Sequence, residues 1–194
     1  MKAKTLVIAC AALTRELRTV LAPFGDAIQV EYLPAPLHNR PERIPDAIVR
    51  VLDAKGHLFD RVVVAYGDCG TGGLLDAVLA ERGISRLPGS HCYEFFAGSA
   101  VFAPLAEEEL GTFFLTDYLA KHFEALIISG LGIDRHPELR DMYFRNYVRV
   151  VLLSQSDDPA IIDLAKAAAA RLGLDFAHRH TGLDPFRESL TSLL

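Results

Sequence analysis

The chain contains three cysteines, and these are the side chains best suited to do chemistry. Cys10, Cys69 and Cys92 lie far apart in the sequence and form no C-x-x-C motif, which excludes a sequence-local zinc finger or ribbon. Three is an odd number and too few for a disulfide framework, so we expect free thiols. Because free cysteine is also a common buried residue, three roles stay open: joint metal binding, a single reactive thiol, or packing alone.

Two of the cysteines follow segments that are typical of buried parallel strands. Residues 5–10 form a short apolar run that ends in Cys10, and the apolar run 61–66 leads into Cys69. Ligands of open parallel sheets bind beyond the carboxyl ends of the strands, and Cys92 lies in a loop that can fold back over the same edge. Three converging thiols suit Zn²⁺ or, as the alternative, a [4Fe-4S] cluster. The sequence therefore predicts a three-cysteine metal site at this edge.

Histidines and one glutamate supply further candidates. His180, at the end of the last expected strand, is the preferred fourth metal ligand, because His91 is adjacent to Cys92 and joint binding by both would strain the chain. A bound substrate is another candidate for the fourth position. In the metal-free alternative, Cys69 is a nucleophile with His180 or His91 as its base. Glu94 is a candidate proton acceptor in catalysis, or equally a solvated helix residue.

A glycine-rich loop surrounds Cys69 at residues 67–73. Gly70, Gly72 and Gly73 could let the backbone approach a cofactor closely, and the helix that follows could stabilise an anion or lower the pKa of a thiol. The loop matches neither standard nucleotide-binding motif, so nucleotide binding has weak support. The alternative is a tight strand-to-helix turn.

Two later segments contain polar residues that could line a pocket. Residues 111–118 read as a core helix from which Thr112 could contact a cofactor. Residues 139–147 are rich in Arg and Tyr, and Arg140 could balance thiolate charge or hold an anionic substrate. A surface salt bridge is an equal alternative for Arg140.

The alternation of apolar runs and helical patterns predicts an α/β fold: one open, mostly parallel sheet with helices on both faces. We expect a single domain over 1–194, in which a mostly helical insertion over 88–145 caps the carboxyl edge of the sheet. The expected strands are 5–10, 27–33, 61–66, 147–153 and 174–180. The expected helices are 14–21, one from 45, one from 74 to about 82, 92–97, 104–110, 112–123, 138–145, 159–172 and 184–194.

Composition narrows the function classes. The 194 residues are 51% hydrophobic and 23% charged, with a net charge of −5. The absence of a basic block disfavours a nucleic-acid surface. No run approaches the roughly 18 apolar residues that a membrane span needs, and the first residues do not read as a signal peptide. We therefore expect a cytoplasmic protein that contacts neither nucleic acid nor a membrane.

Several motifs in order resemble the DUF1638 family of uncharacterised proteins. They are YGDCG at 66–70, HCYEFFAG at 91–98, GTFFLTD at 111–117, LRDMYFRNY at 139–147 and HTG at 180–182. The likeness covers roughly residues 5–183, and the family pattern includes cysteines that match Cys69 and Cys92.

The resemblance implies a link to corrinoid-dependent methyltransferase systems, beside which members are often encoded. The expected role is then to assist methyl-group transfer on a small-molecule ligand, such as a thiol or a methyl donor or acceptor, with corrinoid or methyltransferase proteins as partners. No corrinoid-binding D-x-H-x-x-G motif is present. A metal-dependent transferase and a non-enzymatic accessory or carrier protein both stay open.

Overall fold

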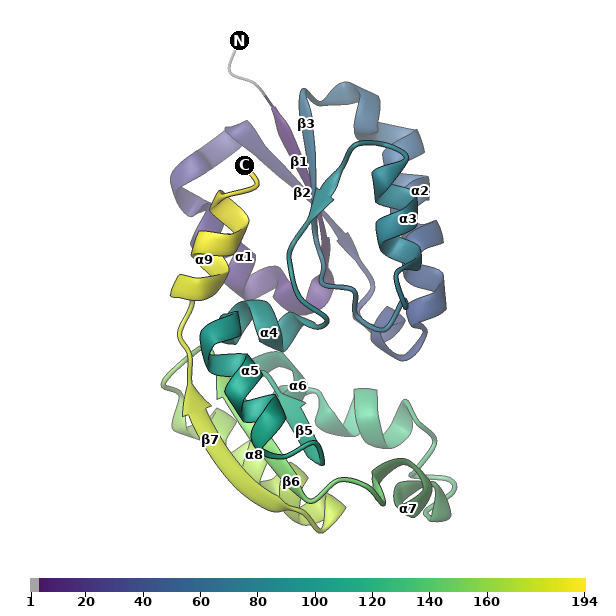
Figure 1. Ribbon diagram of the computed structural model, residues 1–194, viewed down its shortest axis with the longest axis vertical. Helices are drawn as coiled ribbons and strands as arrows, with labels where there is room; N and C mark the ends of the chain where they lie inside the picture. Colours follow the sequence, from purple (N-terminus) through teal and green to yellow (C-terminus); the bar gives the residue numbers. More distant parts are fainter. Residues whose placement is uncertain (1–3) are drawn as a thin grey trace. The chain divides into compact units, whose positions relative to one another are not determined.

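The computed structural model describes residues 4–194, which divide into two compact units (Figure 1). Unit 1 contains the chain up to Phe95 together with Phe186–Leu194, and unit 2 contains Phe96–Pro185. Each unit is built around its own parallel sheet.

Unit 1 has a four-stranded sheet in the order β2-β1-β3-β4, and all of its pairings are parallel. The register pairs Ala9 of β1 with Ala65 of β3, so the two strands end at the same level. The strands are β1 (Thr5–Cys10), β2 (Ile28–Leu33), β3 (Arg61–Ala65) and β4 (Ser85–Arg86). The helices are α1 (Thr14–Leu21), α2 (Ile44–Lys55), α3 (Leu74–Ala80), α4 (Cys92–Ala97) and α9 (Asp184–Thr191). The last residues of α4 and the first residues of α9 belong to unit 2.

Helices cover both faces of this sheet (Figure 1). Leu6 and Ile8 of β1 are fully buried against α2 and α3, where Ile48 and Leu75 are also fully buried. The opposite face lies against α1 and α9, and Phe186 of α9 stacks on Phe95 with ring centroids 5.3 Å apart. Strands buried on both faces need continuous apolar sequence, which explains the unbroken run in β1.

Unit 2 has a three-stranded parallel sheet in the order β5-β6-β7. Its strands are β5 (Thr112–Leu115), β6 (Arg149–Ser154) and β7 (Asp175–His180). Its helices are α5 (Ser99–Glu108), α6 (Asp117–Lys121), a π-helical segment (Glu124–Ser129), α7 (Glu138–Phe144) and α8 (Pro159–Leu172). The core of the unit packs the alanine-rich face of α8 and the apolar residues of α6 and the π-helical segment against Val150 and Leu152 of β6.

The helix expected over 112–123 is wrong, because its first part is strand β5. Both faces of this strand are packed with aromatic rings: Phe113 meets Phe144 edge-on at 5.2 Å, and Phe114 lies 5.1 Å from Phe102. Thr116 then caps α6 by accepting a hydrogen bond from the backbone N–H of Leu119 at 3.3 Å. A short strand followed at once by a capped helix spaces apolar residues much as one longer helix would.

The predicted α/β class with parallel strands and flanking helices is confirmed. The strands fall into two sheets rather than one, because β5, within the expected insertion 88–145, pairs with β6. The short strand β4 was not expected. Within residues 4–194, no helix has the length and apolar character that a membrane crossing requires. The single-domain prediction over 1–194 stays a prediction.

Candidate functional site

Cys10 and Cys69 lie at the carboxyl edge of the unit 1 sheet. Cys10 is the last residue of β1, and the loop after β3 carries Cys69. Extending the β1–β3 register by one residue places Tyr66 beside Cys10, and all three side chains contact the same apolar cluster under α2 and α3. Sheet register therefore brings two of the predicted metal ligands to one place.

Cys92, the first residue of α4, belongs to the same group of thiols. Burial raises its pKa well above the ordinary value, and the charges of Cys69 and Cys10 raise it further. Burial likewise raises the pKa of Cys69 to about 11, with Cys10 adding to the rise, and burial raises the pKa of Cys10. The three thiols are thus near enough to influence one another's ionisation, and each is protonated at neutral pH.

Each sulfur also has a backbone N–H that favours its thiolate form. Hydrogen bonds from Ala12 to Cys10, from Gly67 to Cys69 and from Tyr93 to Cys92 each act to lower the pKa of the thiol. Such donors are typical of environments that stabilise a thiolate once it forms.

The side chains do not stand at ligating distance. Across residues 4–194, no group of three or more His, Cys, Asp and Glu side chains has the arrangement of a metal site. A cysteine sulfur moves between three staggered positions by rotation about one bond, without any backbone movement.

Tyr66 places a buried hydroxyl among the thiols. Its side chain is 3% exposed, and a hydrogen bond between its hydroxyl and the Cys10 side chain acts to lower the pKa of Cys10. Burial raises the pKa of Tyr66, and the charge of Cys10, the hydrogen bond with Cys10 and the charge of Cys69 raise it further. The hydroxyl therefore stays protonated and available as a donor.

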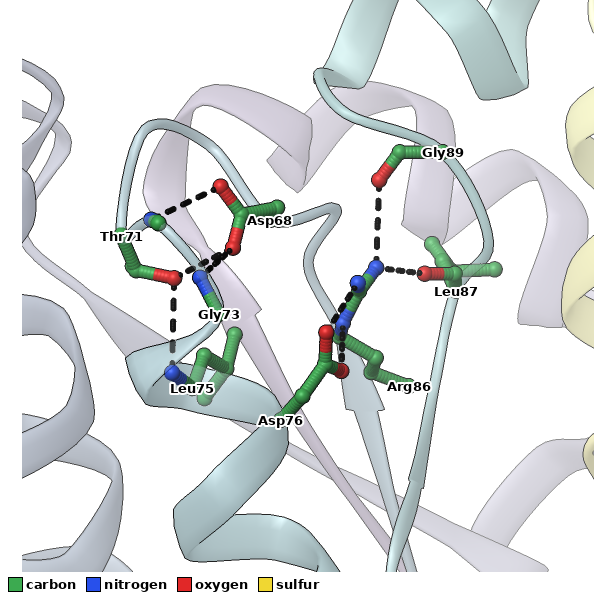
Figure 2. Close-up of polar contacts among 9 residues, drawn as sticks. Asp68, Thr71, Gly73, Leu75, Asp76, Arg86, Leu87 and Gly89 are labelled. Atoms are coloured by element: carbon green, nitrogen blue, oxygen red, sulfur yellow. Dashed lines mark hydrogen bonds and ion pairs between the residues drawn. The ribbon is translucent and has the colours of Figure 1, made fainter.

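The glycine-rich loop is organised by Asp68 (Figure 2). Its carboxylate accepts hydrogen bonds from the Thr71 hydroxyl at 2.6 Å, the Gly73 N–H at 2.9 Å and the Gly72 N–H at 3.1 Å. The Thr71 hydroxyl, followed by these two N–H groups, lowers the pKa of Asp68. The N–H groups of Gly72 and Gly73 are therefore already used in hydrogen bonds to this carboxylate. Their predicted role in binding a cofactor stays a prediction.

The pKa of the Cys69 thiol is raised, not lowered. Burial, the charge of Cys10 and the charge of Asp68 outweigh the lowering effects of the Gly67 hydrogen bond and of Arg86. Cys69 has φ of +51° and is the one non-glycine residue in 4–194 with a left-handed backbone. Gly70 follows with φ of +84°, so two consecutive left-handed residues turn the chain sharply beside the thiol.

An arginine ties the neighbouring loop to α3 (Figure 2). Arg86 binds Asp76 with two hydrogen bonds of 2.6 and 2.8 Å, and its remaining nitrogen donates to the carbonyls of Leu87 and Gly89. The carbonyl of Gly89 also accepts from the N–H of Asp68, at 3.0 Å. The arginine thus fixes the segment that leads to Cys92 against the loop that carries Cys69.

Glu94 has a structural role in this arrangement. Its carboxylate accepts a hydrogen bond from the N–H of Ser90 at 2.7 Å, one turn before it in the chain. A Cβ atom on Gly89 would lie only 2.8 Å from the same carboxylate, so a larger residue at position 89 would collide with it. The predicted catalytic role of Glu94 stays a prediction.

Two histidines are near each other at the same edge, and sequence reasoning missed one of them. Desolvation and the charge of His91 lower the pKa of His38, which lies in the proline-rich loop after β2. Burial lowers the pKa of His91, opposed by Asp68. The position of His38 in the sequence could have identified it, because it lies just beyond the carboxyl end of a strand, near the level at which Cys10 ends β1.

His180 lies in unit 2, at the carboxyl end of β7, within a polar cluster. Ser154 Oγ is 2.9 Å from His178 Nε2 and 3.2 Å from His180 Nδ1, and Asp157 Oδ1 is 3.3 Å from that same nitrogen. Partial desolvation and the charge of His180 lower the pKa of His178. The sequence identified His180 and its strand end but not its pairing with His178. The predicted roles of His180 as base and as fourth ligand stay predictions.

The loops after β5 and β6 are joined by Asp117, which is 2% exposed. Its carboxylate accepts from the Gln155 N–H at 3.0 Å and from the Ser156 hydroxyl, and its own N–H donates to Gln155 Oε1 at 3.0 Å. These hydrogen bonds connect the two loops at the carboxyl edge of the second sheet.

Thr112 and Arg140 make local contacts in unit 2. The Thr112 hydroxyl donates to the Glu109 carbonyl at 2.6 Å and accepts from Arg149, at the amino end of β5. Arg140 binds the exposed carboxylate of Asp141 at 2.6 Å, which is the surface alternative raised for it. Their predicted cofactor contacts stay predictions.

Two parallel α/β units, one with cysteines and the other with serine and histidine side chains at its carboxyl edge, define the structural class. The chain belongs to the DUF1638 family, whose model, described as "protein of unknown function", matches residues 32–190. The curated proteins contain no match to this sequence. Among solved structures, ornithine carbamoyltransferase from Pyrococcus furiosus is similar at 16% identity with a TM-score of 0.31, over 92% of this chain and 55% of the carbamoyltransferase.

Proposed function

We propose that the chain is a metal-binding protein in which Cys10, Cys69 and Cys92 bind one Zn²⁺ ion, with a [4Fe-4S] cluster as the alternative. The observation that carries this proposal is the gathering of three thiols, distant in sequence, at the carboxyl edge of one sheet. Thiolates are preferred ligands of both groups.

Two features of the three cysteines support such a group. The thiols come from one unit of the fold, and each has a backbone N–H that favours its thiolate. Rotation about the cysteine side-chain bonds must bring the sulfurs to ligating distance.

A zinc ion with three protein thiolates and one open position would act as a Lewis acid and activate a bound thiol at neutral pH. The chain's own contribution would be to hold the sulfurs and to limit the access of water, since all three are partly buried. The assisting role in corrinoid-linked methyl transfer, with a thiol or methyl donor or acceptor as ligand and methyltransferase proteins as partners, is part of this proposal.

The raised thiol pKa values count against the metal-free alternative. A cysteine nucleophile is normally activated by a lowered pKa, whereas burial raises the pKa of Cys69 to about 11. A metal ion overcomes this burial effect because its positive charge stabilises the thiolate directly.

Elemental analysis with an absorption spectrum, on protein purified without chelator and without oxygen, tests the proposal. About one zinc per chain supports the zinc version, and a brown chromophore with about four iron atoms supports the cluster. Less than about a tenth of an equivalent of either metal, in protein whose thiols are reduced, would overturn both. The non-enzymatic carrier alternative predicts the same metal content, together with complex formation and no turnover alone.

A further inference from the structure

Strand β7 (Asp175–His180) is an outer edge of the unit 2 sheet (Figure 1). It pairs with β6 on one side, and no strand among the described residues continues the sheet beyond it. Its residues pair with β6 without interruption, so it contains neither a bulge nor a proline, and all of them except the half-buried Phe176 are exposed. Because proteins usually shorten, bend or cover such edges, this regular edge indicates a place where a further strand can be added.

The main-chain groups of alternate β7 residues point away from β6. The N–H of Asp175 donates to the carbonyl of Val148 at 3.0 Å. A residue in a parallel ladder directs its N–H and its C=O to the same side, so the odd-numbered residues of β7 face β6. Phe176, His178 and His180 therefore present their N–H and C=O groups at the free edge.

A second copy of the chain fits this edge by antiparallel pairing about a two-fold axis. Opposite residues must then lie on the same face of the sheet, so the two residue numbers add to an even sum. With Ala177 on the axis, Phe176 is opposite His178 of the second copy as a hydrogen-bonded pair. Asp175 is then opposite Arg179 of the second copy as a non-hydrogen-bonded pair.

The side chains of β7 are complementary to one another in this register. Side chains approach most closely at non-hydrogen-bonded positions, where opposite Cα atoms are ~4.5 Å apart. The small Ala177 occupies such a position on the axis, and the two-fold symmetry forms the ion pair of Asp175 with Arg179 twice. Glu108 and Glu109 line a groove with Asp175 at the amino end of β7, which places further acidic groups near Arg179 of the second copy.

We propose that β7 is a dimerisation edge, which pairs antiparallel with β7 of a second copy of this chain. The main-chain hydrogen bonds supply the affinity, and the side-chain pairs select the register. A second copy is favoured over a strand of another protein because the charges of the edge are complementary to its own sequence read in reverse. The inference is independent of the proposed metal site, since no cysteine lies on β7.

Exchanging the two charges tests the interface. The dissociation constant of the dimer is measured by sedimentation of the full chain over a range of concentrations. Asp175→Arg alone and Arg179→Asp alone each place like charges opposite each other, and each should raise this constant at least about tenfold. The double variant restores opposite charges and should return to within about threefold of the wild type. Arg50→Asp, at an exposed position on α2 of unit 1, is the control and should cause no change.

A cross-link on the axis tests the register. Ala177→Cys places two thiols opposite each other, at a Cα separation that a disulfide can span. Oxidation with diamide should convert this variant into covalent dimers on a non-reducing gel. Arg179→Cys, whose thiol is opposite Asp175, should form far fewer, as should the wild type, whose own cysteines lie in unit 1.

Wild-type protein that stays monomeric at all concentrations would overturn the inference. A wild-type dimer that neither single charge variant weakens would also overturn it, because another surface would then form the dimer. The same holds for a double variant that is folded by circular dichroism and does not regain the dimer. None of these outcomes bears on metal content, so they leave the proposed function to its own test.

Discussion

The carboxyl edges of the two sheets differ in how their polar groups are satisfied. In unit 2, Asp117 binds the loop after β6, and Ser154 lies within hydrogen-bonding distance of two histidines. In unit 1, the thiols of Cys10, Cys69 and Cys92 are partly buried, and the hydroxyl of Tyr66 is hydrogen-bonded to the side chain of Cys10.

The same architecture therefore yields two kinds of edge. Parallel strands bring polar residues together at both carboxyl ends, but hydroxyl, carboxylate and imidazole groups can pair with one another. Thiols are weak hydrogen-bond donors and acceptors, so a group of them is left with unused binding capacity for a soft metal ion. Under the proposed function, the unit 1 edge binds a ligand, whereas the polar groups of the unit 2 edge connect its own loops.

Removing one thiol should produce the largest effect. Cys69→Ser replaces a thiolate ligand by a hydroxyl, and we expect Zn²⁺ affinity to fall by at least about 100-fold. Competition with a chromophoric chelator measures this. Ser154→Ala, at the unit 2 edge, is the matched control and should keep wild-type affinity. Comparable losses in both variants would contradict the distinction between the edges.

Metal affinity should rise steeply with pH. Burial raises the pKa of all three thiols, that of Cys69 to about 11, so each is protonated at neutral pH and must lose its proton to bind metal. The apparent Zn²⁺ affinity should then increase about tenfold per pH unit for each thiol that deprotonates, and it should level off only above the pKa of that thiol. Titrations at pH 6, 7 and 8 measure the slope. A pH-independent affinity would show that the thiols are not ligands.

Loss of the Asp117 carboxylate should destabilise the protein without affecting metal content. Asp117→Asn converts a charged acceptor of two hydrogen bonds into a neutral amide in a buried position. We expect the free energy of unfolding to fall by about 1–3 kcal/mol, measured in urea. Metal stoichiometry of the folded variant should equal that of the wild type, and a loss of metal would show that the unit 2 edge also contributes to metal binding.

A smaller effect is expected from loosening the loop before Cys92. Arg86→Lys removes the bidentate contact with Asp76 and the hydrogen bonds to the Leu87 and Gly89 carbonyls, because lysine lacks the planar guanidinium group with its several N–H donors. Unfolding free energy should fall by about 1 kcal/mol. Hydrogen exchange at Asp68 and Cys69, whose N–H groups bond to this loop, should become faster. Unchanged exchange at both residues would show that the arginine does not hold the loops together.

The sequence was sufficient for the elements that local pattern determines. The apolar run 5–10 and the proline-started helix 159–172 have the predicted bounds, because buried strands and capped helices leave local signals. The placement of Cys10 and Cys69 at one edge also followed from strand alternation alone.

What the sequence could not provide depends on contacts between distant residues. β5 was mistaken for a helix because its aromatic residues are sorted onto two faces only by packing against Phe102 and Phe144. The pairing of Ser154 with His178 and His180 depends on the β6–β7 register. The contact between the Tyr66 hydroxyl and Cys10 likewise depends on the pairing of β1 with β3.

Chelation-dependent alkylation of the native protein tests whether the three cysteines bind one metal ion. Protein purified without oxygen is treated with iodoacetamide before and after removal of metal by a chelator, and labelled peptides are quantified by mass spectrometry. If the three cysteines bind one ion, Cys10, Cys69 and Cys92 are protected together and become reactive together when the metal is removed. Labelling of Cys69 alone, at the same rate with and without chelator, would contradict it.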